Sequence, residues 1–302
     1  MSSHRPPKTT ILAAWVIILV ASALPRVILQ EIFHLTVSED LRTTISVGAI
    51  LICLLLTLVW QPLRTLRPFL GLFLVLTGIE WLVFTRIDQL PIFQSWLKDP
   101  SFNVYMLAEK SLSLIVTLVI IAALFILKKQ RQAFFLAKGD TSAQVEPVRW
   151  LVVKEGVTWN KFGGYLALFI SMGTLAFLVI AGQPPLDIVV QALPFLPAVL
   201  LAAALNAFNE EMSWKASFLS VLENPVGRRQ ALWMVAAYFG IAHYYGVPYG
   251  VIGVLLAGFL GWLLAKSMQE THGLFWAWFI HFLQDVLIFS FLAIGSITPG
   301  GG

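Results

Sequence analysis

Long uninterrupted apolar runs constrain this chain more than any other feature. A helix needs about 20 consecutive apolar residues to cross a bilayer core of about 30 Å. The chain repeats such runs, and its 302 residues are 58% hydrophobic and only 12% charged, which excludes an ordinary soluble domain. The sequence therefore predicts an all-α fold, a polytopic transmembrane helical bundle of about eight to nine spans. The expected spans are 9–24, 45–60, 68–85, 105–127, 162–181, 187–208 continuing to about 222, 230–245, 247–266 and 273–294.

The distribution of basic residues predicts the orientation. If the N-terminus is cytoplasmic, 15 of the 20 Lys and Arg residues fall in loops on that side. The first span follows Arg5 and Lys8, and we expect an uncleaved signal anchor, although residues 21–23 resemble a signal-peptidase site. We expect a multi-pass integral membrane protein, in the plasma membrane if the source is bacterial. Since topology explains the net charge of +4, the sequence predicts the lipid bilayer as a partner and no nucleic acid.

A polar connector at 128–161 divides the chain. Residues 1–127 hold about four spans and few intramembrane polar groups, whereas 162–302 hold nearly all of them. The connector begins Lys128-Lys129-Gln-Arg131 and has no sustained helical periodicity. We therefore expect an ordinary cytoplasmic connector rather than an amphipathic segment lying on the membrane, with the active site between helices of the C-terminal half.

Two adjacent carboxylates, Glu210 and Glu211, interrupt an otherwise apolar segment. A charge at bilayer depth costs at least about 2.5 kcal/mol, so such residues usually mark a functional site. Neighbours on a helix point about 100° apart, which predicts separate tasks for the two acids. Lys215 lies four residues after Glu211 on the same face, so the spacing predicts a Glu211–Lys215 pair and leaves Glu210 as a candidate general base. The alternative is a helix end with both acids at the water–lipid interface.

Three further polar residues stand on apolar helices. His243 follows Phe239 by one turn, and His281 and Asp285 are four apart, so that each pair shares a helix face. Taken singly, His243 could be interfacial, and His281 and Asp285 could simply satisfy each other. Burying all three in one half of the chain is costly, which favours a functional site. The motif His-Glu-x-x-His is absent, so any metal site must be assembled from different helices.

These residues resemble a known family. The order Glu-Glu-x-x-x-Arg, Phe-x-x-x-His and His-x-x-x-Asn/Asp on successive membrane helices is similar to the motifs of the CPBP intramembrane proteases, which include CAAX prenyl proteases and bacteriocin-processing or self-immunity (Abi-type) proteins. Here the motifs begin at Glu210, Phe239 and His281, and the resemblance covers about residues 187–294. Asp285 fits the pattern. Lys215 stands where the family has Arg, and a lysine cannot make a bidentate fork.

The resemblance implies peptide hydrolysis without a covalent intermediate. Glu210 would activate water, His243 would position that water or a metal, and His281 with Asp285 would stabilise the oxyanion or complete a metal site. Zn²⁺ bound by His243, His281 and Asp285 is one possibility, and a metal-free site is the other. The implied activity is that of an intramembrane endopeptidase, a metalloendopeptidase if zinc is present, acting on a membrane-associated or lipidated peptide or protein. A CAAX substrate is one option among several, and the oligomeric state stays open.

The resemblance also implies supporting residues, namely Glu211, Lys215 and Phe239. We expect His281 and Asp285 to approach Glu210 and His243 in the folded protein.

Two other functions use the same residue types. A metal-ion or proton-coupled transporter also places Glu, His and Asp on helix faces, but Trp214 stands three residues after Glu211, no His follows on that helix, and no inverted repeat is detectable. A catalytically inactive scaffold is favoured only by Lys215. Glu80, inside an N-terminal span, is expected to be hydrogen-bonded to Thr77 or a neighbouring helix, with a proton or substrate site as the alternative.

Overall fold

The computed structural model describes residues 6–99, 101–127 and 130–297, and it confirms the all-α prediction. The elements of the first half are α1 (Lys8–Ala21), α2 (Leu24–Val27), η1 (Ile28–Ile32), α3 (Glu39–Val59), η2 (Gln61–Leu66), α4 (Arg67–Leu82), η3 (Val83–Ile87), α5 (Pro91–Leu97) and α6 (Phe102–Ile126). The remaining elements are η4 (Arg131–Phe134), η5 (Arg149–Leu151), α7 (Trp159–Gly182), α8 (Leu186–Ala192), η6 (Leu193–Phe195), α9 (Leu196–Glu210), η7 (Glu211–Ala216), α10 (Ser217–Val226), α11 (Arg228–Ala242), α12 (Val251–Thr271) and α13 (Phe275–Ile297).

Seven helical segments in the described part of the chain are long and apolar enough to cross a membrane. An eighth is reached if α1 and the Leu24–Ile32 segment, bent by 53° at Ser22 and Ala23, form one broken span. The expected span at 230–245 is instead α11, which has 15 residues. At 1.5 Å per residue such a helix is about 22 Å long, shorter than the bilayer core. The protein is thus an integral membrane protein, while its cytoplasmic N-terminus and plasma-membrane location stay predictions.

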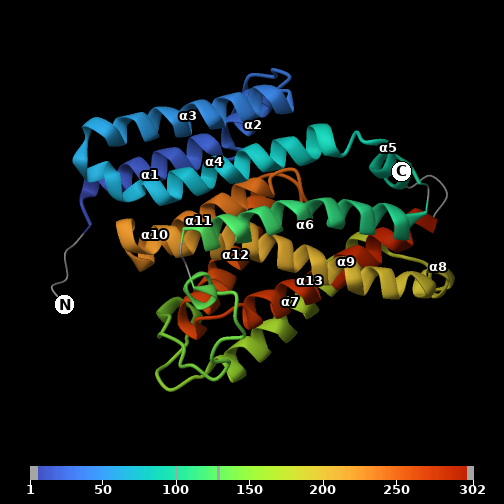
Figure 1. Ribbon diagram of the computed structural model, residues 1–302. Helices are drawn as coiled ribbons and strands as arrows, with labels where there is room; N and C mark the ends of the chain where they lie inside the picture. Colours follow the sequence, from blue (N-terminus) through green and yellow to red (C-terminus); the bar gives the residue numbers. More distant parts are fainter. Residues whose placement is uncertain (1–5, 100, 128–129, 298–302) are drawn as a thin grey trace.

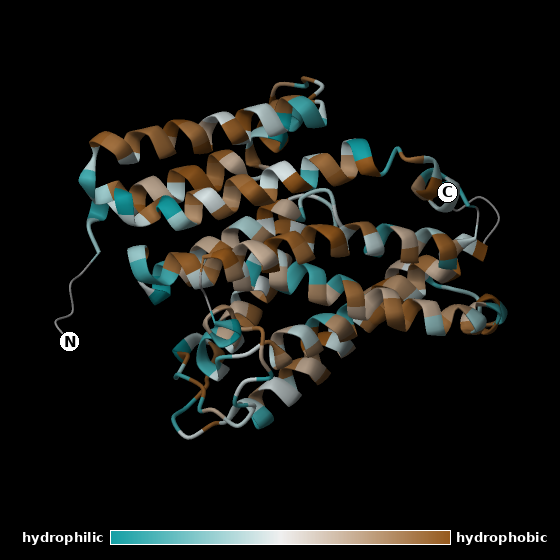
Figure 2. Ribbon diagram, viewed as in Figure 1, coloured by the Kyte–Doolittle hydropathy of each residue, from teal (hydrophilic) through white to brown (hydrophobic). Residues whose placement is uncertain are grey.

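The helices form layers (Figure 1). Helices α1, α3 and α4 pack together on one side of the molecule, and α7 packs on α13 on the other. Between them, α6 packs on α9, α9 on α13, and α11 on α12. Hydrophobic residues run along the helices, and hydrophilic ones gather at the connector and at helix ends (Figure 2). Helix α7 exposes Leu168, Phe169 and Ile180 by 54%, 64% and 73%, a surface that suits lipid rather than water.

The connector is more closely packed than expected. Between residue 130 and α7 it contains short 3₁₀ turns and two isolated β-bridges, and Lys128 and Lys129 lie outside the described residues. Phe134 is fully buried. The backbone amide of Leu274 donates to the carbonyl of Ala137 (2.8 Å), and Trp159 Nε1 donates to Glu270 Oε2 (2.8 Å). The connector therefore packs against the turn between α12 and α13 and fixes the start of the helix that carries His281.

Small residues let α11 and α12 approach each other closely. A Cβ atom added at Gly240 would lie 2.6 Å from the Val254 carbonyl oxygen and 2.9 Å from Gly258 Cα. A Cβ atom at Gly261 would lie 2.8 Å from the Phe239 ring. The contact between these helices thus sets the position of Phe239, which enters the site described below.

We expect Gly240→Ala to destabilise the protein. Alanine favours helices over glycine by up to about 1 kcal/mol, but at this position the added methyl meets backbone atoms, and overpacking costs about 1–3 kcal/mol. The matched control is Gly258→Ala, whose Cβ would lie 3.6 Å from its nearest neighbour, an ordinary contact. Thermal unfolding in detergent compares them. Equal stability of the two variants would contradict this account of the helix contact.

Candidate active site

The two acids lie at a change of helix type. Helix α9 ends at Glu210, residues Glu211–Ala216 form a π-helix, η7, and α10 continues to Val226. These elements belong to one membrane-length segment, Leu186–Val226. Because Glu211 is fully buried well inside that segment, the alternative of a water-exposed helix end does not hold. π-turns are rare, and they occur frequently at functional sites.

Glu211 and Lys215 form the predicted ion pair. Lys215 Nζ donates to Glu211 Oε1 at 2.6 Å, and both side chains are fully buried. The ammonium also lies 3.2 Å from the centroid of the Phe239 ring, a cation–π contact. A compact ammonium thus satisfies both the carboxylate and the ring in this space. The pairing expected from the four-residue spacing is confirmed.

The same carboxylate holds His281. His281 Nδ1 donates to Glu211 Oε1 at 2.7 Å, so one oxygen accepts from a lysine on its own helix and from a histidine on α13. His281 Nε2 lies 3.6 Å from Glu210 Oε2. The two acids were predicted to have separate tasks, and they lie at opposite nitrogens of the His281 ring. Glu211 accepts from Nδ1, and Glu210 lies near Nε2. That both acids reach the same side chain was not expected, because the packing of α13 against the Glu-bearing segment is not visible in the spacing.

Asp285 completes the cluster together with an unpredicted residue, Asn206. Asp285 Oδ1 lies 3.6 Å from His281 Nε2. Asn206 Nδ2 donates to Asp285 Oδ2 (3.0 Å) and to Glu210 Oε1 (3.2 Å), and so joins the two carboxylates. Its sequence signal was available, since Asn206 lies four residues before Glu210 on the same helix face.

His243 joins the cluster through Phe239. His243 caps the C-terminus of α11, and its Nδ1–H donates to the Phe239 carbonyl at 2.8 Å, which leaves Nε2 free to accept. The Phe239 ring lies 4.3 Å from the His243 ring and 6.0 Å from the His281 ring. Both histidines and Asp285 line one cavity of about 450 Å³. The structure thus brings all the predicted site residues together, while their catalytic roles stay predictions.

That cavity is mainly apolar. It lies between α7, α11, α12 and α13, and much of its wall consists of large apolar side chains, namely Ile170, Phe177, Leu178, Leu256, Leu260 and Ile288. The polar atoms that reach it come from the two histidines, Asp285, Gln284 and Thr174. An apolar substrate would therefore meet the cluster at one end of this cavity.

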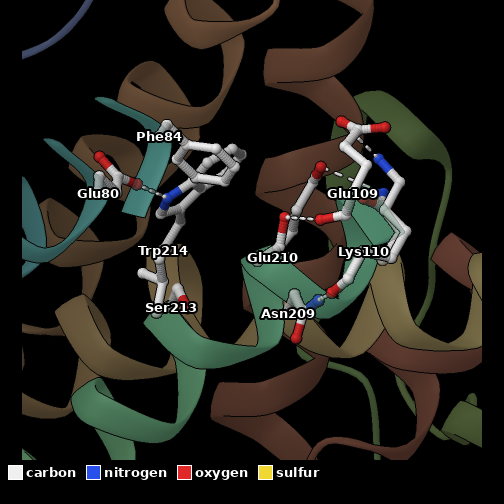
Figure 3. A pocket seen from close by; sticks show the side chains of 11 residues that line it. Glu80, Phe84, Glu109, Lys110, Asn209, Glu210, Ser213 and Trp214 are labelled. Atoms are coloured by element: carbon white, nitrogen blue, oxygen red, sulfur yellow. Dashed lines mark hydrogen bonds and ion pairs between the residues drawn. The ribbon is translucent and has the colours of Figure 1, made fainter. Parts of the chain in front are cut away.

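Glu210 lines a second cavity, of about 230 Å³. Figure 3 shows Glu210 and Lys110 on one side of it and Glu80 and Trp214 on the other. The Glu210 side chain is 18% exposed. Its Oε2 is buried and has no hydrogen-bond partner among the described residues. Asn206 therefore orients Glu210 through Oε1, while Oε2 makes no hydrogen bond and lies 3.6 Å from His281 Nε2.

Glu80 has the interaction with a neighbouring helix that was expected. Trp214 Nε1, on η7, donates to Glu80 Oε1 at 2.9 Å. The same carboxylate lines the Glu210 cavity. Helix α4 of the N-terminal half thus supports the π-helix that carries Glu211 and Lys215.

The predicted zinc ligands do not have the arrangement that zinc needs. Across the described residues, no three His, Cys, Asp or Glu side chains are grouped so that they could hold a metal ion. Both histidines hydrogen-bond through Nδ1, to the Phe239 carbonyl and to Glu211, and a histidine held in this way keeps its Nε2 available for a metal. Because no metal-binding group forms among the described residues, the chemistry below is derived from the side chains alone, and zinc stays a prediction.

We expect Lys215→Met to destabilise the protein strongly. The substitution keeps most of the side-chain volume but leaves Glu211 buried without its cation, and breaking a buried pair costs about 3–5 kcal/mol. The double variant Glu211→Gln/Lys215→Met removes both charges and should recover part of this loss. Unfolding of the purified variants measures the difference. A single variant as stable as the wild type would refute the pairing.

Comparison with known proteins gives one match. Residues 192–287 match the family model of the type II CAAX prenyl endopeptidase Rce1-like proteins. The matched segment runs from the start of the Glu-bearing span into α13 and contains all the residues of the cluster. It confirms the resemblance to the CPBP family over this part of the chain. No curated protein matches the chain, and no solved structure does so either.

Proposed function

We propose that this protein is an intramembrane endopeptidase in which Glu210 activates the hydrolytic water. The observation that carries the proposal is the buried, unpartnered Oε2 of Glu210, which lies 3.6 Å from His281 Nε2 where a polar cavity reaches the cluster. A polar gap longer than about 3.5 Å is one that a water molecule can bridge. The match to CAAX prenyl endopeptidases supports the same reading.

The reaction needs a base, a proton donor and an oxyanion partner. Glu210 Oε2 takes a proton from the bridging water, and the resulting hydroxide attacks the peptide carbonyl. Glu210 then gives that proton to the leaving amine as the C–N bond breaks. One water is consumed, and one carboxylate and one amine are formed, so no external reagent is required.

The histidines serve the oxyanion in this scheme. Glu211 holds His281 through Nδ1, so that Nε2 points toward Glu210 and Asp285. When Nε2 carries a proton, it can donate to the oxygen that becomes negative. Asp285, which accepts a hydrogen bond from Asn206, lies 3.6 Å from this Nε2. The Nδ1–H of His243 donates to the Phe239 carbonyl, so its Nε2 can position water or substrate.

The substrate class follows from the apolar cavity. About 450 Å³ of mainly apolar space ends at His243 and His281. This space suits a membrane-associated or lipidated peptide whose scissile bond lies next to Glu210. The family match supports a peptide of CAAX type.

Glu210→Gln should lower the rate of hydrolysis strongly while leaving the fold intact. Glutamine keeps the size of the side chain and can still accept from Asn206, but it cannot take a proton, and general-base catalysis contributes about 10²–10⁴-fold. The assay uses a farnesylated CAAX peptide in lipid vesicles, with release of the C-terminal tripeptide measured by mass spectrometry. Glu109→Gln is the matched control, because Glu109 lines the same cavity but forms its ion pair with Lys110 rather than with the histidines.

Wild-type cleavage that persists in Glu210→Gln would exclude Glu210 as the base. Cleavage lost equally in Glu109→Gln would show that the cavity's charge, rather than the position of Glu210, matters.

Asn206→Leu should lower kcat by about tenfold or more with little change in KM, because the variant loses only the hydrogen bonds that orient Glu210 and Asp285. Steady-state kinetics on the same peptide measure both constants. A rise in KM at constant kcat would assign Asn206 to substrate binding instead.

A further inference from the structure

A third cavity adjoins the Glu210 cavity. It has a volume of about 340 Å³ and lies between α3, α4 and α11. Its wall includes charged and hydroxyl-bearing side chains, namely Glu39, Arg42, Thr43, Thr85 and Tyr238. It shares Glu80, Phe84 and Trp214 with the Glu210 cavity, so these residues separate the two spaces. We call the third cavity the entry cavity.

Each of the two cavities is lined by a residue that has a buried polar atom without a hydrogen-bond partner among the described residues. These atoms are Thr43 Oγ1 beside the entry cavity and Glu210 Oε2 beside the Glu210 cavity. Buried polar groups are otherwise almost always satisfied by protein or by ordered water. Each cavity has room for several waters, since one molecule occupies about 30 Å³ in the liquid. Both cavities therefore have the size and the polar lining residues to hold water.

The entry cavity also reaches the surface. Glu39 and Arg42, which are paired at 2.7 Å, have side chains that are 46% and 25% exposed. Glu39 is the first residue of α3 and of a membrane-length segment, so this end of the cavity lies where the span meets the membrane surface. The path from there to Glu210 is narrowed at Trp214, whose indole is held by Glu80 at 2.9 Å.

We propose that the entry cavity and the Glu210 cavity together form the route by which water reaches Glu210, with Trp214 as its constriction. The use of this water in hydrolysis rests on the proposed function. The route itself does not, because it follows from the cavities and the orphaned polar atoms. Water and an apolar substrate then approach the cluster from different sides, so that filling the apolar cavity with substrate does not block the supply of water.

Cysteine accessibility tests the route without any assay of proteolysis. The single cysteine, Cys53, is first replaced in Cys53→Ser. Thr43→Cys probes the entry cavity and Ser113→Cys the Glu210 cavity. The matched control is Ser111→Cys, two residues earlier on α6 and exposed on its outer face. The protein in lipid nanodiscs is treated with trimethylammonium-ethyl methanethiosulfonate, which modifies thiolates in water and not thiols in lipid.

We expect Thr43→Cys to react at least about tenfold faster than Ser111→Cys. Ser113→Cys should react slowly and gain about tenfold when combined with Trp214→Ala, while Ser111→Cys stays unchanged. Phe84→Ala provides a second way to widen the shared wall if Trp214→Ala does not fold. Equal rates for Thr43→Cys and Ser111→Cys, or a Ser113→Cys rate that neither widening variant raises, would overturn the proposal. These outcomes are independent of whether the protein cleaves a peptide.

Discussion

The site depends on one buried carboxylate oxygen. Glu211 Oε1 accepts from Lys215 Nζ and from His281 Nδ1, and it thereby ties the π-helix η7 to α13. Phe239 covers the Lys215 ammonium and adds α11 to the same group. All of the hydrogen bonds of this carboxylate among the described residues fall on Oε1, since its other oxygen, Oε2, is buried without a hydrogen-bond partner. The orientation of the His281 ring, and with it the approach of Glu210 and Asp285, follows from this arrangement.

The site includes the C-terminal end of the short helix α11. With 15 residues it spans about 22 Å, less than the bilayer core of about 30 Å, and His243 caps its C-terminus. Close packing of Gly240 against α12 holds that end in place. The cluster then lies between two cavities, one lined mainly by large apolar side chains and one lined mainly by polar and charged residues.

Much of this site could be predicted from local spacing. The pairs Glu211–Lys215 and His281–Asp285 are four residues apart on single helices, and each pair is in contact or within 3.6 Å. What spacing does not reveal is packing between helices. The bond from His281 to Glu211 and the link from Trp214 to Glu80 join segments far apart in the sequence. The spacing of Asn206 to Glu210 was visible in the sequence, but its bond to Asp285 joins two helices and was not. The helix expected to span at 230–245 is shorter than predicted, because hydropathy does not show where a helix ends.

The central claim is that Glu210 and His281 act as one unit. A double-mutant cycle on peptide hydrolysis, with Glu210→Gln, His281→Ala and the double variant, tests it most directly. Groups that act together show strongly non-additive effects, so the account predicts that the double variant loses hardly more activity than the worse single variant. Losses that multiply, as for two independent residues, would contradict it.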